Sequence, residues 1–188
     1  MRRVIVLFVI IAFWCCAQAQ WSVGLDARIA PWGSDNKKHM GTVMTLNYRL
    51  PVSSFYVMPS VGLFYTNFFE EADWDGGKCY GNSGYQTGFD FALVVGKSFG
   101  VGIGKLSVFT GPRYAYAFAS KSNIGADYVP HNFDWRIGVD YSISKFTISA
   151  KIDIATLKLL KDEEYAFGIR KYSEHQVPTL AVGLAYHF

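Results

Sequence analysis

The chain has 188 residues, of which 51% are hydrophobic, 17% aromatic and only 18% charged. This length predicts one domain, and the charged fraction lies below the roughly 25% of ordinary soluble proteins, so a large apolar surface is expected. The formal charge is +3, and two of the basic residues, Arg2 and Arg3, lie in an N-terminal segment that we expect to be removed. The remaining charge is 16 minus 15, or +1, which excludes a strongly basic nucleic-acid binder.

That N-terminal segment has the order of a secretory signal peptide. Two arginines precede an apolar run over residues 4–14, and Ala-Gln-Ala at 17–19 supplies small residues for cleavage. The apolar run is shorter than the ~20 residues that a membrane helix needs. We therefore predict a cleaved signal at 1–19 and an exported domain at 20–188.

The three cysteines allow a second interpretation of the N-terminus. A lipoprotein would be modified at Cys15 or Cys16, but the bulky aromatic residues that precede them disfavour this alternative. After signal cleavage only Cys79 remains, and a single cysteine forms no internal disulfide. We predict that Cys79 is an unpaired thiol without a specific role.

Beyond the signal, apolar and polar residues alternate in segment after segment, which is typical of half-buried β-strands. Trp21, Val23 and Leu25, for example, alternate with small or charged residues. The eight segments with this pattern are 21–32, 40–50, 55–66, 85–96, 105–119, 133–144, 146–155 and 179–188. They predict an all-β fold.

Short and long connections take turns between these segments. In chain order they are 33–39, the short 51–54, the long 67–84, the Gly-rich 97–104, the longer 120–132, the tight 144–145 and the long 156–176. Bacterial outer-membrane barrels have an even number of strands, tight periplasmic turns and longer external loops. We therefore predict an eight-stranded antiparallel up-and-down transmembrane β-barrel in the bacterial outer membrane.

The two faces of the predicted strands differ in charge. One face, which includes every second residue from Trp21 to Ile29, carries no charged residue in any of the eight segments. An Arg or Lys that faces lipid at the bilayer midplane costs about 2–4 kcal/mol, so this face is predicted to contact lipid. A soluble β-sandwich with both faces buried is the alternative. The opposite face carries Asp26, Arg28, Arg49, Asp90, Arg113, Asp134, Arg136, Asp140, Lys151 and Asp153.

These ten charged residues are predicted to line the barrel interior. Acids and bases are equal in number, and each buried charge needs a partner, so we expect a salt-bridged network. Side chains can fill an eight-stranded barrel completely. A filled interior is expected, with a narrow pore for small solutes as the alternative. Inward glycines are expected to relieve crowding at Gly24, Gly41, Gly62, Gly88, Gly111, Gly138 and Gly183.

Aromatic residues are predicted to form girdles at the two membrane interfaces. The short-turn girdle consists of Trp21, Tyr48, Phe55, Tyr141, Phe146, Tyr186 and Phe188, and the opposite girdle of Tyr65, Tyr116, Phe118, Phe133 and Trp135. Three prolines interrupt the strand patterns. Pro178 can begin its strand and Gly111–Pro112 can mark a bulge, while Pro59 indicates either a bulge or a wrong register.

The Ala-Gln-Ala-Gln signal end, the alternating strands, the stretch "TGPRYAY" and the terminal Phe188 resemble the small outer-membrane barrels of the OmpA/OmpX-like and PorT-like type. The resemblance implies that the barrel-assembly machinery reads the last strand as an insertion signal. The matching residues are Leu180, Val182, Leu184, Tyr186 and Phe188. We expect a monomer among outer-membrane lipids and lipopolysaccharide, without a cofactor and without nucleic acid.

Function is predicted to lie in the external loops, through a structural or surface-interaction role with an unidentified extracellular ligand. The acidic stretch "EEADWDGGK" lacks the spacing of a calcium loop, so we expect a solvated loop and no metal site. Tyrosines available for surface contacts are Tyr80, Tyr85, Tyr128 and Tyr165.

Catalysis is a further alternative, because some eight-stranded barrels modify lipid A with a His, a Ser and an acid. Two groups bring these residue types together in the sequence: Ser34, Asp35 and His39, and Ser173, Glu174 and His175. Neither group has the His-x-Ser arrangement found in the eight-stranded barrel that deacylates lipid A. A nucleophile also needs a base within hydrogen-bond reach. We therefore predict no enzymatic activity.

Overall fold

The computed structural model describes residues 20–30, 38–74, 77–122, 130–155, 163–165, 168–170 and 178–188. The predicted signal peptide at 1–19 lies outside the described residues. Most of the described chain is β-strand, and none of it forms a helix long and apolar enough to span a membrane.

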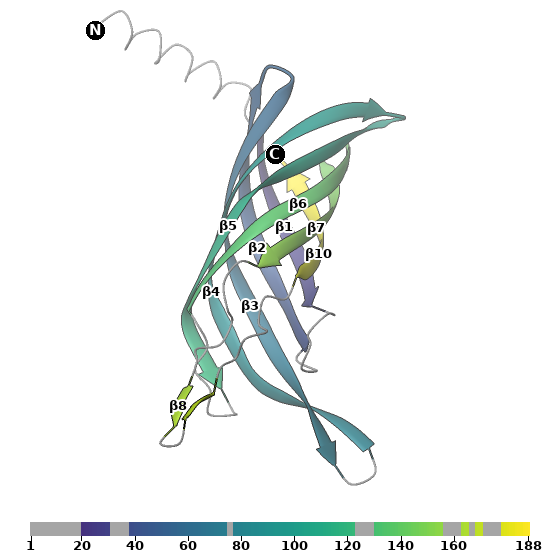
Figure 1. Cartoon of the computed structure of the whole chain (residues 1–188). Helices are drawn as coiled ribbons and strands as arrows, with labels where there is room; N and C mark the ends of the chain where they lie inside the picture. Colours follow the sequence, from purple (N-terminus) through teal and green to yellow (C-terminus); the bar gives the residue numbers. More distant parts are fainter. Residues whose placement is uncertain are drawn as a thin grey trace, which may run out of the picture.

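Eight strands form one closed barrel (Figure 1). They are β1 (Gln20–Ala30), β2 (Lys38–Val52), β3 (Phe55–Trp74), β4 (Gly77–Val101), β5 (Gly104–Ser122), β6 (His131–Ile143), β7 (Phe146–Ala155) and β10 (Thr179–His187). Antiparallel pairing runs from β1 through β7 in sequence order, and β10 pairs with both β7 and β1 to close the sheet. The predicted all-β, eight-stranded antiparallel barrel is confirmed. A separate two-stranded sheet pairs β8 (Glu163–Tyr165) with β9 (Gly168–Arg170).

The prediction of a long loop at 67–84 is wrong, because β3 and β4 continue through it as a hairpin. Their pairing extends to Trp74 and Gly77, with one register shift between Phe68 and Phe69. In Figure 1 this hairpin projects past the ends of the other strands. Outside the barrel wall neither strand face has to be apolar, so the alternation of hydrophobicity is lost although backbone pairing continues.

The connection predicted at 97–104 is also wrong in length, because β4 and β5 pair as far as Val101 and Gly104. Only Gly102 and Ile103 remain as a turn. Two-residue turns likewise join β2 to β3 and β6 to β7. The first residue of each turn has a left-handed φ, which is 57° at Ser53, 58° at Gly102 and 53° at Ser144. Such turns match the twist of antiparallel strands.

Glycine at Ser53 or Ser144 is expected to stabilise the barrel. A left-handed φ costs a residue with a Cβ about 1–2 kcal/mol, whereas glycine adds about 0.4–1 kcal/mol of unfolded-state entropy, so each substitution gains roughly 0.5–1 kcal/mol. The matched control is Ser54→Gly in the same turn as Ser53, where no left-handed φ offsets the entropy and stability falls. Equilibrium unfolding in urea measures both effects, and equal losses at Ser53 and Ser54 would contradict the account.

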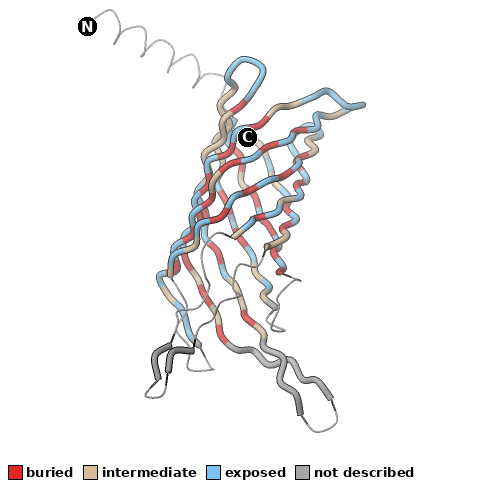
Figure 2. The backbone as a smooth tube through the Cα atoms, in the orientation of Figure 1, coloured by how far each residue is buried: buried red, intermediate tan, exposed pale blue. Residues whose placement is uncertain are grey.

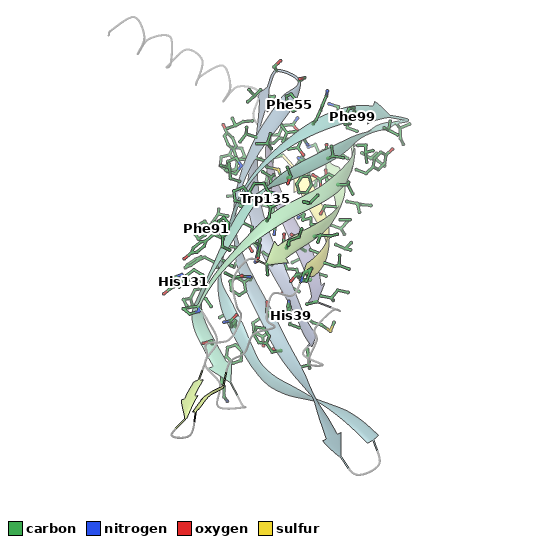
Figure 3. All side chains as sticks on the ribbon, in the orientation of Figure 1. His39, Phe55, Phe91, Phe99, His131 and Trp135 are labelled. Carbon is green, nitrogen blue, oxygen red and sulfur yellow. The ribbon has the colours of Figure 1, made fainter. Side chains whose placement is uncertain are left out.

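Burial alternates along the barrel strands in the sense opposite to that of a soluble barrel (Figure 2). On β1 the apolar Leu25 is 59% exposed, while its neighbour Asp26 is 1% exposed. Met44, Ile148 and Leu184 are exposed in the same way on other strands. In Figure 3 side chains such as Phe91 and Trp135 lie on the outer surface of the wall. The barrel therefore has an apolar exterior and a polar, charged core.

The two central prolines interrupt the backbone ladders without changing the register. Pro59 pairs with Leu93 of β4, while the β2–β3 ladder omits the pairs that Met58 and Pro59 would form and then resumes in the same register. Pro112 interrupts the β4–β5 ladder in the same manner. The bulge predicted at Gly111–Pro112 is therefore wrong; the register shift of β4 against β5 lies at Thr87 and Gly88.

The C-terminus is held to the barrel by backbone hydrogen bonds. The His187 N–H donates to the carbonyl of Lys145 (2.8 Å), and the Phe188 N–H donates to the carbonyl of Trp21 (3.1 Å). The ring of Phe188 is 72% exposed and packs edge-on against Tyr186. The end of β10 therefore lies beside the start of β1, at the rim with the short turns.

Candidate functional site

The structure places the ten charged residues of the predicted interior set on the inner side of the barrel wall. Arg49 and Lys151 are half-buried, and the other eight are buried. Each of these side chains points into the barrel, while the residues before and after it on the same strand point outward. Four arrangements result: a central cluster of six, a lysine–aspartate pair, an arginine without a carboxylate partner, and Asp140, which is in none of the described ion pairs.

The central cluster joins three arginines and three aspartates from β1, β4, β5, β6 and β7. Arg113 lies at its middle, where its Nε donates to Asp90 (2.7 Å) and its Nη1 donates to Asp134. The remaining contacts are Arg28 to Asp90 (3.0 Å), Arg28 to Asp153 (3.8 Å), Arg113 to Asp153 (3.6 Å), and two hydrogen bonds from Arg136 to Asp153 (2.6 and 2.9 Å). The cluster is charge-balanced, so each charge offsets the desolvation of another.

The central cluster lies toward the rim with the long connections. Arg28 and Asp153 are each two residues from the strand end at that rim, and Asp134 is the fourth residue of β6, which begins there. The paired charges of the central cluster therefore lie nearer to this rim than to the short turns.

A second pair lies nearer the short turns. The ammonium of Lys151 on β7 donates to both carboxylate oxygens of Asp26 on β1, each at 2.8 Å. Gly183 on the intervening strand β10 makes room for this pair, because a Cβ there would lie 1.9 Å from an Asp26 oxygen. The inward glycine thus gives space for a charged contact, as the crowding argument predicts.

Arg49 and Asp140 are not joined in an ion pair. The Arg49 Nη2 donates to Ser98 (2.5 Å) and Ser107 (3.2 Å), and its guanidinium lies 3.6 Å from the ring centre of Tyr56. Both charged residues line an inner cavity of about 30 Å³. A polar cavity of this size has room for about two water molecules.

Apolar side chains complete the filling of the interior, and the sequence analysis did not identify them. One cluster consists of Val43, Phe64, Ala115 and Ala117, and a second of Tyr56, Val94 and Phe109 with Met58 packed against it. These residues come from β2 to β5, whereas the lysine–aspartate pair and most of the aspartates come from the opposite strands. Their inward parity is visible in the sequence, but parity does not show which inward side chains pack together.

A larger hollow of about 850 Å³ opens at the rim with the short turns. We call it the short-turn vestibule. Its lining includes Arg49 toward the barrel interior, and Lys97, Lys105, Lys145 and His187 around the mouth. The sequence did not reveal this basic hollow, because its five basic residues come from five different strands and turns.

Aromatic contacts mark both rims. At the short-turn rim, Trp21 packs on Tyr48 with ring centres 4.5 Å apart, and Phe146 packs edge-on against Tyr186 at 5.4 Å. At the other rim, Tyr65 stacks on Tyr85 at 6.0 Å. Here too lies His131, labelled in Figure 3, whose Nδ1 is 2.5 Å from the hydroxyl of Tyr114. Both rims therefore carry rings on the outer face.

The residues considered for catalysis do not come together in the described part of the chain. His39 makes a 3.1 Å hydrogen bond with Thr179, and His187 a 2.7 Å bond with Thr147. Ser34, Asp35, Ser173, Glu174 and His175 lie outside the described residues. Within the described ranges no three His, Cys, Asp or Glu side chains are arranged to hold a metal ion. The side chains of Cys79, Tyr80 and the acidic stretch are likewise outside what is described, as are Tyr128 and the side chain of Tyr165.

No protein-family model and no curated protein matches this chain. Among solved structures, it is similar to a major outer membrane protein from Thermus thermophilus, with a TM-score of 0.52 and 16% identity over 91% of this chain and 100% of that one. Two further similar structures are Ail, the attachment invasion locus protein of Yersinia pestis, crystallised with the heparin analogue sucrose octasulfate (TM-score 0.43, 16% identity, 90% and 97% covered), and the translocator domain of the autotransporter NalP from Neisseria meningitidis (TM-score 0.37, 12% identity, 90% and 88% covered). The chain thus has the fold of outer-membrane β-barrel proteins.

Proposed function

We propose that this chain is an integral protein of the bacterial outer membrane, with a sealed barrel and a structural or surface-interaction role carried by its long-connection end. The observation that carries the proposal is the inverted polarity of the wall, with exposed apolar residues outside and paired charges inside. In water such an exterior would expose an apolar surface far larger than a monomer tolerates. In a bilayer the same apolar exterior would contact the hydrocarbon chains of the lipids.

The long hairpin of β3 and β4 supports the interaction role. It continues the barrel wall past the other strands, on the rim opposite the C-terminus (Figure 1). Segments that project from a rigid scaffold commonly carry binding. In the proposed orientation the short turns face the periplasm and this hairpin faces outward, where lipopolysaccharide and an extracellular ligand would be its partners.

The interaction role is tested by shortening the hairpin. A variant without residues 70–81 keeps the barrel wall, and the matched control keeps the same length with those residues replaced by Gly and Ser. We expect both variants to insert normally and to lose binding of cells to host or abiotic surfaces equally. Unchanged adhesion in both variants would contradict an interaction role for this hairpin.

Insertion itself is proposed to depend on the terminal strand, whose outward residues include Leu184, Tyr186 and Phe188. These side chains are apolar and lie on the outer face, where a barrel-assembly machinery would read them. Heat-modifiable migration on gels measures the folded barrel, because a closed barrel migrates differently before and after boiling. Equal migration of the purified chain before and after boiling would overturn the proposal.

Wild-type protein in planar bilayers is expected to show no single-channel conductance steps. The central cluster, the Lys151–Asp26 pair and the two apolar clusters together occupy the interior. A narrow pore is the competing function, and reproducible steps from heat-modifiable protein would establish it. A conductance that appears only when Arg113 and Arg136 are replaced together by serine would locate the seal in the central cluster.

A further inference from the structure

We propose that the short-turn vestibule binds the phosphate headgroup of an anionic phospholipid in the leaflet next to the short turns. This inference rests on the proposed membrane setting and adds a ligand that the proposed function does not name. It starts from the charge around the vestibule, which is basic although the chain as a whole is nearly balanced.

Charge complementarity is the first argument. Four Lys and Arg side chains line the vestibule, together with His187. The five acidic side chains that the structure describes, Asp26, Asp90, Asp134, Asp140 and Asp153, are not among its lining residues. The carboxylate that does lie there among the described residues is the main-chain group of Phe188. The vestibule therefore attracts anions.

The position of two lysines favours a lipid over a soluble anion. The ammonium of Lys97 lies 5.5 Å from the ring centres of both Phe55 and Phe99, and that of Lys145 lies 5.7 Å from the ring centre of Tyr186. These rings are on the outer, lipid-facing surface, and Phe55 and Phe99 are labelled at the rim in Figure 3. Lysines whose stems follow apolar surface place their charge at the level of lipid headgroups.

Both lysines also line the vestibule, so the basic surface is continuous from the lipid face into the barrel mouth. Lys97 on β4 and Lys145 in the β6–β7 turn lie on different parts of the rim, so a headgroup phosphate can contact either lysine while its acyl chains remain beside the neighbouring aromatic rings. An anion free in solution would gain nothing from those ring contacts.

Arg49 supplies the inner wall of this site. The other interior bases, Arg28, Arg113, Arg136 and Lys151, each form an ion pair with an aspartate. No carboxylate among the described residues lies within 4 Å of Arg49, whose guanidinium is oriented by Ser98, Ser107 and Tyr56. An oriented, half-buried guanidinium open to a hollow can donate a charge-assisted hydrogen bond to a phosphate.

Native mass spectrometry of the full barrel tests the proposal. The protein is released from micelles that contain equal amounts of phosphatidylglycerol and phosphatidylcholine, and bound lipids are counted. Each lysine near an anionic headgroup contributes about fivefold in affinity, so the preference for phosphatidylglycerol should fall by at least about tenfold in Lys97→Gln/Lys145→Gln. The matched control is Lys121→Gln at the opposite end of β5, which should keep the wild-type preference.

Equal retention of the two lipids by wild-type protein would overturn the proposal, as would an equal loss in the Lys121 control. A second measurement adds inorganic phosphate to the spray solution and asks whether it binds to the protein. If it binds to protein that shows no lipid preference, the vestibule is a site for soluble anions instead. Heat-modifiable migration is checked first. Wild-type protein that fails this check contradicts the proposed function, whereas folded wild-type protein without lipid preference contradicts only the lipid site. Variants are compared only when they pass the same check.

Discussion

Replacement of Arg113 with methionine is expected to reduce the free energy of unfolding by about 3–5 kcal/mol, because removing one member of a buried charge cluster leaves the others unpaired. Arg113 contacts Asp90, Asp134 and Asp153, and all three carboxylates are buried. Methionine fills much of the same volume, so the loss reports on charge pairing more than on packing. Urea titration of the barrel in vesicles, followed by tryptophan fluorescence, measures it.

The matched control is Arg49→Met, which removes an interior arginine that has hydroxyl and ring partners but no carboxylate within 4 Å in the described structure. Its loss should be smaller, about 1.5–3 kcal/mol, since the partners left behind are neutral hydroxyl groups and a ring, and no buried carboxylate loses its counter-charge. Equal losses for the two variants would show that the central cluster does not stabilise the barrel by pairing its charges.

An arginine in place of Leu25 is expected to cost about 2–4 kcal/mol in a bilayer. Leu25 is an exposed residue in the middle of β1, opposite Met44 on β2 and Leu184 on β10. A guanidinium there would face the hydrocarbon core. The same urea titration measures the loss, and in a soluble barrel the substitution of so exposed a residue would be nearly neutral.

Ile103→Arg is the control for the Leu25 substitution. Ile103 is 87% exposed in the turn between β4 and β5, at the short-turn rim, so an arginine there reaches water. Its cost should stay below about 1 kcal/mol, as for charges near the interface. A control that loses as much stability as Leu25→Arg would contradict a depth-dependent lipid environment.

The barrel could be predicted because each strand repeats one local rule. On β1 the alternation of Leu25 and Ile29 with Asp26 and Arg28 identifies a strand, its inner face and the inverted polarity at once. Prediction failed at residues 67–84, where the strands leave the wall and no apolar face is required. It also failed at 97–104, where glycines and Phe99 obscured a two-residue turn.

The charged site was only partly accessible from sequence. Parity indicates which side chains point inward, but their partners depend on the stagger between strands. Lys151 meets Asp26 across 125 residues and across the intervening strand β10, and no local spacing encodes that contact. For the same reason the sequence did not distinguish Arg49, which meets serines and a tyrosine, from the four interior bases that meet aspartates.

The central claim, that the wall separates lipid from a filled interior, is tested most directly by a nitroxide scan of β7 in reconstituted vesicles. Labels replace residues 147–150 one at a time, and their collision rates with oxygen and with a water-soluble nickel complex are compared. We predict high oxygen accessibility at Ile148 and Ala150 and low accessibility to both reagents at Thr147 and Ser149, because the first pair is exposed and the second buried. High nickel accessibility at Ile148 and Ala150, or the absence of a two-residue period, would contradict the account.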